Sequence, residues 1–231
     1  MKNALYLICL LMMSQLAAAQ YFIPEMSSNG LISSPEVYAI TMENDTLRGK
    51  IRSALLMSGQ LKSFTIKKDD GTKVKFKSGE AKLLAVKPSK MANLESAMSV
   101  PNLRTLMKVD FDDVINREWV FYELAMLDKK KDKPRMMQLL NPGFDSKIKV
   151  YLDPNAKETK GGMLLGGGED KSYLVLFDGD KVDTYKKKRY NKEAKNLLFK
   201  DCKVFMENYD GERFKWKNFA EHVFVYDQLC D

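Results

Sequence analysis

The chain has 231 residues, of which 45% are hydrophobic and 30% are charged, and its formal net charge at pH 7 is +7. This balance is ordinary for a protein that folds around a core, and it excludes an intrinsically disordered chain. The excess of lysine and arginine is compatible with anionic partners such as acidic glycans or lipid headgroups, and equally with a surface that simply stays hydrated.

The first twenty residues have the layout of a secretory signal peptide. Lys2 is followed by an apolar run over 4–13, and the small residues Ala17 and Ala19 precede Gln20. The run is shorter than the roughly 20 residues that a spanning helix needs. We therefore expect a signal peptide over 1–19, export to a periplasm, a cell surface or the medium, no transmembrane segment in the mature chain and no nucleic-acid partner.

Short alternating runs separated by turns dominate the first predicted module, residues 20–88. After an irregular leader over 21–35, strands are expected over 36–42, 46–53, 61–67, 72–77 and 82–87, with a loop over 55–60. Short antiparallel strands of this kind are typical of a small barrel or curled sheet. Gly49, inside the second strand, is interpreted as a bulge or as the tight bend of such a barrel.

The strand expected over 72–77 carries the first candidate binding site. Its period of two places Val74 and Phe76 on one face, and Lys73, Lys75 and Lys77 on the other. This cationic row can hold an anionic ligand, and it can equally keep the strand from pairing with another chain. Both interpretations stay open.

Residues 89–118 are predicted to connect the first module to a second one over 119–231. The connector carries methionine and leucine at helical spacing, and Pro101 ends that pattern. Further strands are then expected within 117–127, 135–140 and 146–154, followed by a hairpin over 172–188.

The end of the chain is predicted to be helical, with two apolar stripes. Tyr190, Ala194, Leu197, Leu198 and Cys202 share one face of a first helix, and Phe219, Ala220, Val223, Tyr226 and Cys230 share one face of a second. Asn191 is the expected N-cap of the first helix, and Asn218 with Glu221 has capping-box spacing at the second.

Cys202 and Cys230 end these two stripes, so both face whatever the helices pack against. An even pair of cysteines in an exported protein forms a disulfide by default, and we predict a bond between these two. His222, the only histidine, lies off the Cys230 stripe and is badly placed to activate a thiol. One histidine and two distant cysteines also lack the spacing of a zinc site. We interpret His222 as an ordinary, partly buried helix residue.

Two further motifs lack residues that their chemistry requires. The glycine-rich segment 161–168 has no lysine followed by serine or threonine where a phosphate loop needs them, and it is interpreted as a surface loop. Asp178, Asp180 and Asp183 lack the glycine and the final glutamate of a calcium loop, and they are interpreted as turn residues and solvated strand ends.

Pairs of carboxylates are the remaining route to an enzyme. Glu118 with Glu123, or Asp112 with Asp113, would suit glycoside hydrolysis if a pair flanked a substrate. Nothing in the sequence fixes their separation. We therefore assign no catalytic residue, no metal and no cofactor.

The densest charge run is the second candidate binding segment. It consists of Lys186, Lys187, Lys188 and Arg189 and lies between Tyr185 and Tyr190. In one interpretation the cations pair with an anionic glycan or lipid headgroup on which the tyrosine rings stack. In the other, the run is a solvated strand end.

Three segments together resemble uncharacterised exported proteins of Gram-negative bacteria. They are VYAITM followed by DTLRGKI early in the chain, the lysine-rich YKKKRYNKEAKNLLFKDC, and the final FAEHVFVYDQLC. The resemblance implies export, a β-rich domain and a short helical tail, and it carries no activity to particular residues.

The sequence thus predicts an α+β protein that is mainly antiparallel β. We expect a small N-terminal barrel-like sheet, a second β-rich region and short C-terminal helices. The expected function is non-enzymatic: binding of another envelope protein or of an anionic surface polymer. The alternative is a carboxylate-dependent hydrolase that acts on envelope or dietary polymers.

Overall fold

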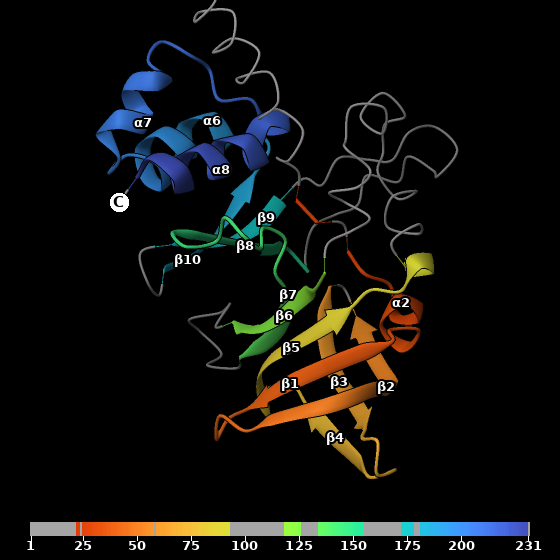
Figure 1. Cartoon of the computed structure of the whole chain (residues 1–231). Helices are drawn as coiled ribbons and strands as arrows, with labels where there is room; N and C mark the ends of the chain where they lie inside the picture. Colours follow the sequence, from red (N-terminus) through yellow and green to blue (C-terminus); the bar gives the residue numbers. More distant parts are fainter. Residues whose placement is uncertain are drawn as a thin grey trace, which may run out of the picture.

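The computed structural model describes residues 22–23, 25–57, 59–92, 118–125, 134–154, 172–177 and 181–230. They form an antiparallel barrel, a second antiparallel sheet and a group of short C-terminal helices, which confirms the expected fold class. Figure 1 shows the barrel at one end of the molecule, the helices at the other and the second sheet between them. The expected signal peptide and most of the connector lie outside the described residues.

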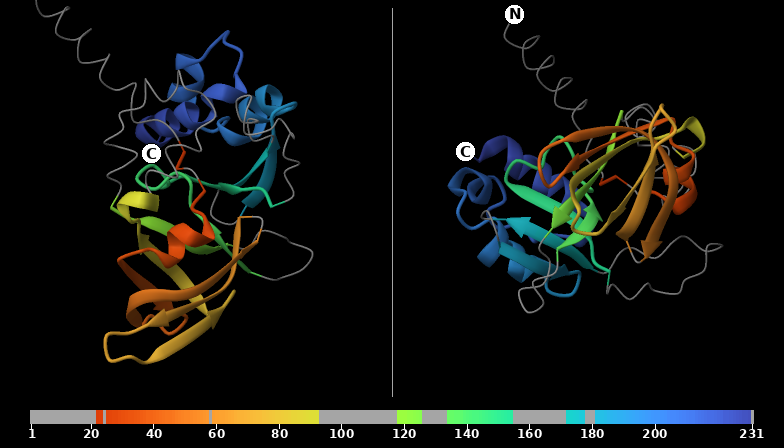
Figure 2. Two further views of the ribbon diagram at one scale, coloured as in Figure 1. Left: turned by 90° about the vertical axis from the view of Figure 1, so that its right-hand side faces the viewer. Right: turned by 90° about the horizontal axis from the view of Figure 1, so that it is seen from below.

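Six strands close the barrel in the order β2-β1-β5-β6-β7-β3, because β3 also pairs with β2. The strands are β1 (Glu36–Thr41), β2 (Thr46–Met57), β3 (Gln60–Lys67), β5 (Ala81–Lys87), β6 (Val120–Ala125) and β7 (Arg135–Gln138), and β4 (Lys73–Lys77) lies outside the ring. One edge of β3 pairs with β7 at Gln60 and Leu61 and with β4 over 63–67. β6 and β7, which follow the predicted boundary at residue 88, thus complete the barrel (Figure 2).

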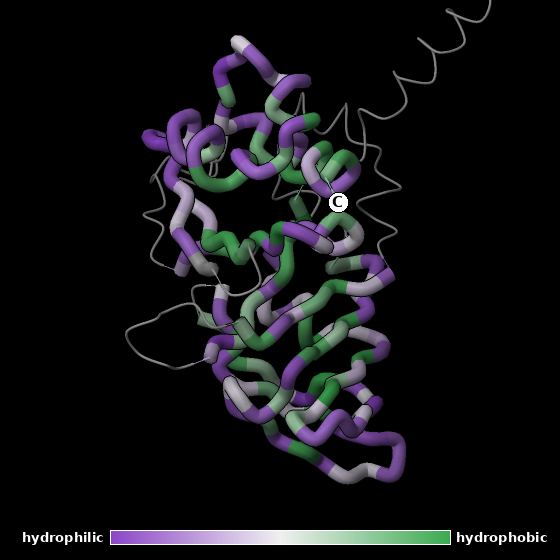
Figure 3. Tube along the Cα trace, turned by 90° about the vertical axis from the view of Figure 1, so that its left-hand side faces the viewer, coloured by the Kyte–Doolittle hydropathy of each residue, from purple (hydrophilic) through white to green (hydrophobic). Residues whose placement is uncertain are grey.

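Side chains that point alternately inward and outward build the barrel core. Val37 and Ala39 of β1 are fully buried, whereas their neighbours are only partly covered. Phe76 of β4 stacks on Phe64 of β3 with ring centroids 4.9 Å apart. The same alternation of hydrophilic and hydrophobic residues is visible along the barrel strands in Figure 3. Burial of each large apolar side chain contributes roughly 1.5–3 kcal/mol to the free energy of unfolding.

The connection between β2 and β3 is much tighter than predicted. The loop expected over 55–60 is wrong, because β2 continues to Met57 and β3 begins at Gln60. Gly59 has a φ of +70°, which glycine adopts without strain. The two strands therefore continue through most of the expected loop, and Met57 pairs directly with Gln60.

The leader expected over 21–35 is part of the fold. It contains helix α2 (Ser28–Ile32), where the hydroxyl of Ser27 accepts a hydrogen bond from the N–H of Gly30 at 3.0 Å. Leu31 is fully buried in the barrel core. Just before the helix, the N–H of Met26 donates to Oε1 of Gln138 at 2.8 Å. The segment therefore covers one end of the barrel.

Gly49 allows two strands to approach closely. A Cβ at this position would lie 2.3 Å from the carbonyl oxygen of Lys67 and 2.8 Å from Cγ2 of Ile66, both on β3. The register of β2 against β3 shifts after Ile51 and after Leu55, so Gly49 is not itself the bulge. The tight-bend interpretation is the one that the geometry favours.

We expect Gly49→Ala to lower the free energy of unfolding by about 2 kcal/mol, because the methyl group must displace the backbone of β3. Urea titration monitored by circular dichroism measures the change. Lys50→Ala, the exposed neighbour on the same strand, is the control and should shift it by less than about 0.5 kcal/mol. Equal effects of the two changes would contradict the close approach.

The second sheet has the order β10-β9-β8 and is separate from the barrel sheet, with an isolated antiparallel bridge between Leu139, just after β7, and Tyr151 of β8. Its strands are β8 (Ile148–Leu152), β9 (Ser172–Phe177) and β10 (Lys181–Lys186). The buried amide of Asn141 holds the junction: its Nδ2 donates to the carbonyl oxygens of Phe144 and Ile148 at 2.8 and 2.7 Å. Its Oδ1 accepts from the N–H of Val150 at 2.8 Å. These three bonds satisfy a polar group that would otherwise be costly to bury.

The C-terminal helices are α6 (Tyr190–Glu193), the π-helical turn η1 (Ala194–Leu198), α7 (Lys203–Asn208), the 3-10 turn η2 (Trp216–Asn218) and α8 (Phe219–Leu229). The single helix predicted over 190–202 is wrong. The N–H of Phe199 donates to the carbonyl oxygen of Ala194, five residues back, so the chain is wound more widely there. As a result Phe199 is buried and Leu197 is 39% exposed. No helix among the described residues is long and apolar enough to cross a membrane.

Of the two predicted helix caps, the one at Asn191 is wrong, and the one at Asn218 is right in position but lacks the expected capping hydrogen bond. Arg189, not Asn191, occupies the N-cap of α6, and Oδ1 of Asn191 instead accepts from the N–H of Phe214 at 2.7 Å. Asn218 does sit at the N-cap of α8, but its side chain makes no capping hydrogen bond. The first of these side chains therefore joins two distant segments instead of starting a helix.

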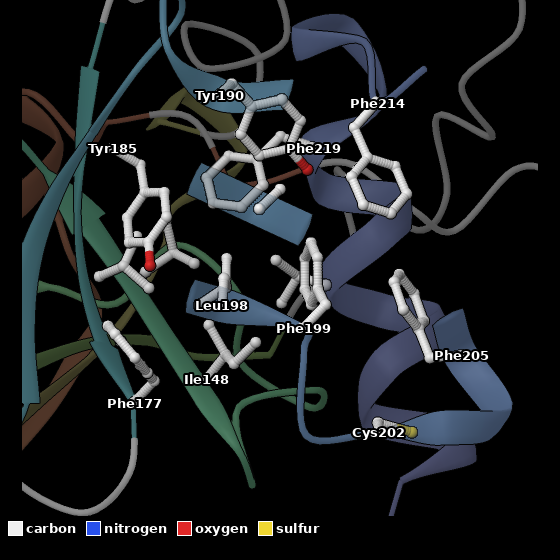
Figure 4. Close-up of a cluster of buried hydrophobic side chains, with 14 of the residues drawn as sticks. Ile148, Phe177, Tyr185, Tyr190, Leu198, Phe199, Cys202, Phe205, Phe214 and Phe219 are labelled. Atoms are coloured by element: carbon white, nitrogen blue, oxygen red, sulfur yellow. The ribbon is translucent and has the colours of Figure 1, made fainter. Parts of the chain in front are cut away.

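Aromatic rings fill the space between the second sheet and the helices, as Figure 4 shows. Phe177 and Tyr185 enter from the sheet, and Tyr190, Phe199, Phe205, Phe214 and Phe219 enter from the helical segments. Many of their ring centroids lie 4.6–6.5 Å apart, which is the range in which aromatic pairs attract one another. This core holds the C-terminal half together.

Candidate functional site

The outward face of β2, β3 and β4 carries the candidate site. The row Lys73, Lys75 and Lys77 is exposed on β4, on the face that the alternation predicts. Residues directly opposite in an antiparallel pair share a face. The register places Lys67 of β3 opposite Lys73, and Lys50 of β2 opposite Lys67. A rank of three exposed lysines thus crosses three neighbouring strands, which are spaced about 4.8 Å apart.

The lysines of this rank form no ion pair within the described part of the chain, although Asp69 and Asp70 lie in the turn between Lys67 and Lys73. None of Lys50, Lys67 and Lys73 forms an ion pair with a described residue, whereas the neighbouring Arg48 pairs with Glu36 at 3.4 Å. Like charges placed directly opposite each other destabilise a sheet, at roughly 0.2–1 kcal/mol for each pair. The rank therefore costs stability in the free protein.

Hydroxyl groups lie beside the lysine rank on the same face. The next two ranks along the strands are Ser53, Thr65 and Lys75, and then Leu55, Ser63 and Lys77. The hydroxyl of Ser53 donates to Oγ1 of Thr65 at 3.1 Å. Arg52, at the register shift next to Ser53, is exposed as well. The face thus combines cations with neutral hydrogen-bonding groups.

The second predicted binding segment lies elsewhere. Lys186, Lys187, Lys188 and Arg189 are exposed at the end of β10 and in the turn before α6. Figure 1 places this turn in the helical half, away from β4, so the structure does not bring the two cationic segments together. Arg189 is engaged, because its Nε lies 3.0 Å from Oε1 of Glu193.

The tyrosines that flank this second segment cannot stack on a ligand. Tyr185 and Tyr190 are each only 1% exposed, and both rings belong to the aromatic core. The interpretation in which they form a stacking platform is therefore wrong. The apolar stripe of the first predicted helix already placed Tyr190 on the packed side, whereas the burial of Tyr185 was not predicted.

The predicted disulfide between Cys202 and Cys230 is present, with the two Cα atoms 5.7 Å apart. Cys202 immediately precedes α7 and Cys230 immediately follows α8, so the bond joins the ends of two helices. Neither sulfur is left as a thiol. The pair is a structural link and not a reactive site.

His222 is more deeply buried than predicted. It is 2% exposed, and its Nδ1 lies 2.7 Å from the hydroxyl of Tyr190. The rings of Phe199, Phe214 and Tyr209 also surround it. Burial lowers the pKa of His222 to about 4. No group of three or more side chains suited to holding a metal occurs among the described residues.

The carboxylates considered for hydrolysis are engaged separately. Nζ of Lys149 donates to both oxygens of Glu123 at 2.9 and 2.8 Å, and the hydroxyl of Tyr151 donates to Oε2 at 3.1 Å. This cluster ties β6 of the barrel to β8 of the second sheet. Glu118 lies before β6, is exposed, and is 3.9 Å from Nζ of Lys87. The two glutamates therefore do not form a converging pair.

The other acidic residues and the glycine-rich segment considered in the sequence lie outside the described residues, except Asp183, which bonds only to its neighbour. Asp112, Asp113, Asp178, Asp180 and the segment 161–168 lie outside them. Asp183 accepts a hydrogen bond from the N–H of its neighbour Thr184 at 2.7 Å. It is exposed, as predicted, but it lies within β10 and not in a turn or at a strand end.

Comparison of the chain with models of known protein families, with curated proteins and with solved structures yields no match. Function must therefore be argued from the residues of the site itself.

Proposed function

We propose that this protein is an exported, non-enzymatic binding protein that holds an anionic polymer, such as an acidic glycan of the cell envelope, on the outward face of β2, β3 and β4. The observation that carries the proposal is the rank of Lys50, Lys67 and Lys73, in which like charges stand side by side without a carboxylate partner among the described residues. A polyanion supplies the counter-charges and turns repulsion into attraction.

The extent of the face favours a polymer over a small anion. Lys73, Lys75 and Lys77 follow one another along β4 at intervals of about 7 Å, which is twice the rise per residue of a strand. A single small anion reaches only a part of this row, whereas a chain of linked acidic units follows it. The hydroxyls of Ser53 and Thr65 suit the neutral hydroxyls of a sugar.

Export is part of the proposal. It is supported by the signal peptide expected over 1–19 and by the resemblance to exported proteins of Gram-negative bacteria. The Cys202–Cys230 disulfide fits the same picture, because such bonds persist in oxidising compartments.

We expect the double change Lys50→Gln and Lys67→Gln to weaken binding to an immobilised acidic glycan roughly 30-fold, at about 1 kcal/mol for each lysine. Binding of the unchanged protein should also fall steeply as salt is raised, because salt screens exposed charges. Elution from the glycan column at increasing salt, followed by titration calorimetry, measures both effects.

Two control variants remove the same charge elsewhere. Lys215→Gln with Lys217→Gln neutralises two exposed lysines of the helical half, and Lys186→Gln with Lys188→Gln neutralises the second cationic segment. Both should keep most of the affinity, and a loss confined to either of them would contradict the assignment to the barrel face. The Lys50 and Lys67 changes should also leave the protein equally or more stable, because they relieve like-charge repulsion.

A further inference from the structure

The hydrogen bonds at the two ends of β4 determine which backbone groups face its free edge. The N–H of Lys68 donates to the carbonyl oxygen of Thr72 at 2.9 Å, and the N–H of Ser78 donates to that of Lys62 at 2.9 Å. Hydrogen-bonded and non-hydrogen-bonded pairs alternate along an antiparallel ladder. The even-numbered residues of β4 therefore bond to β3, and the odd-numbered residues direct their N–H and C=O groups to the opposite edge.

Part of this edge is closed by the chain itself. The N–H of Lys77 donates to Oε2 of Glu80 at 2.7 Å, and the carbonyl oxygen of Lys77 accepts from the N–H of Glu80 at 3.1 Å. Lys73 and Lys75 have no such partner within the described part of the chain, where β4 pairs only with β3. Their N–H and C=O groups form a short open edge, and the spacing of these groups at every second residue matches the hydrogen-bonding groups of an added antiparallel strand.

The side chains around the edge define what can dock there. In an added antiparallel strand, the residues opposite Lys73 and Lys75 share the outward face with them, so acidic side chains are favoured at those positions. The residue between them lies beside Val74, which is only partly buried against the barrel core, so an apolar side chain is favoured there. A second copy of β4 is disfavoured, because it places lysine against lysine.

We propose that the open edge of β4 is a docking site for an extended segment of a partner protein that carries acidic residues at alternate positions with an apolar residue between them. The partner adds a strand to β4 through the backbone groups of Lys73 and Lys75, and the lysine side chains select its sequence. The inference goes beyond polymer binding and does not depend on it: both use the side chains of Lys73 and Lys75, but strand addition also needs their backbone groups at the sheet edge and does not need Lys50 or Lys67.

Amide hydrogen exchange of the whole protein tests the geometry. In the free protein, the amides of Lys73 and Lys75 should exchange fast, whereas those of Val74 and Phe76 should be protected by the ladder. Addition of the capped peptide Glu-Val-Glu-Val-Glu should slow exchange at Lys73 and Lys75. The lysine peptide Lys-Val-Lys-Val-Lys should leave it unchanged.

Two matched pairs separate strand addition from simple charge attraction. A Glu-Val peptide with methylated backbone nitrogens keeps its charges but cannot donate, and it should bind about tenfold more weakly. On the protein, Lys75→Gln keeps the N–H at the edge and should weaken binding of the Glu-Val peptide about fivefold or less. Lys75→Pro also removes that N–H and should weaken peptide binding by at least about a further tenfold. Proline is compatible with an edge position whose N–H lies outside the ladder.

Equal binding of the methylated and unmethylated peptides would overturn the inference, and this comparison holds even if the proline variant fails to fold. Equal binding of the Gln and Pro variants would overturn it as well. In either case, retention of an acidic glycan that still depends on Lys50 and Lys67 would leave the proposed function standing. Conversely, slower amide exchange at Lys73 and Lys75 on addition of the peptide, without retention on the acidic glycan, would support strand addition at β4 and refute the proposed polymer binding.

Discussion

Opening the Cys202–Cys230 disulfide is expected to lower the free energy of unfolding of the C-terminal half by roughly 3 to 4 kcal/mol, because the bond closes a loop with a sequence separation of 28 residues. Cys202 precedes α7 and Cys230 follows α8, so the bond encloses both helices. Without the bond, the unfolded chain gains conformational entropy, and this gain is what lowers the stability of the folded state. For a chain of this length, such a loss lowers the melting temperature by roughly 10 °C.

The two tryptophans report on the two halves separately. Trp119 packs against Tyr38 of the barrel with ring centroids 5.1 Å apart, and Trp216 stacks on Tyr173 in the C-terminal half at 5.4 Å. Thermal unfolding of Trp119→Phe and Trp216→Phe, each with and without reductant, therefore resolves where stability is lost. We expect the Trp216 signal to shift and the Trp119 signal to move less. Melting that does not respond to reductant in either variant would contradict a structural role for the bond.

Acidification is expected to destabilise the same half through His222. Its pKa is about 4 in the folded protein and 6.5 in a solvated side chain, so between these values the unfolded chain binds a proton that the folded protein does not. Stability is therefore complete above about pH 6.5 and falls by about 3 kcal/mol as the pH drops towards 4. Urea unfolding at several pH values measures the slope.

The surroundings of His222 explain why its pKa is lowered on folding. Burial raises the pKa of Tyr190, so its hydroxyl stays protonated and shares a hydrogen bond with Nδ1 of the neutral ring. Two other titratable residues are near His222: the ring of Tyr209 packs against the imidazole, and Glu221 precedes His222 on α8. Unlike Tyr190, neither of them forms a hydrogen bond with the imidazole. The double change His222→Phe and Tyr190→Phe removes the polar pair together and should flatten the slope. A slope that persists in this variant would assign the pH dependence to another group.

Local pattern was sufficient for most of the barrel. The strands around Val37 and Phe64 have short alternating sequences, the strand around Leu84 is a short apolar run between lysines, and these signals do not depend on distant parts of the chain. The end of β2 was missed because apolar residues follow one another there and Gly59 makes a turn of minimal length. Helix α2 was missed because a single turn has too few residues to show a period.

The site was only partly predictable for a different reason. The exposed row on β4 follows from the sequence of one strand, but the rank of Lys50, Lys67 and Lys73 depends on the register between three strands. That register includes a shift after Ile51, which no local pattern indicates. His222, by contrast, did carry a signal, since it lies three residues after Phe219 on the buried side of α8.

The order of strands around the barrel has a consequence for the newly made protein. β1 to β5 are complete once residue 87 has been synthesised, yet the cylinder stays split between β5 and β3 until β6 and β7 follow. During that interval the edge of β5 and the start of β3 at Gln60 and Leu61 lack the hydrogen-bonding partners that they have in the complete barrel. A product truncated between residues 92 and 118 would keep this split permanently. Emergence of Arg135–Gln138 is therefore the step that closes this gap, after which the short edge of β4 at Lys73 and Lys75 is the barrel edge left open within the described part of the chain.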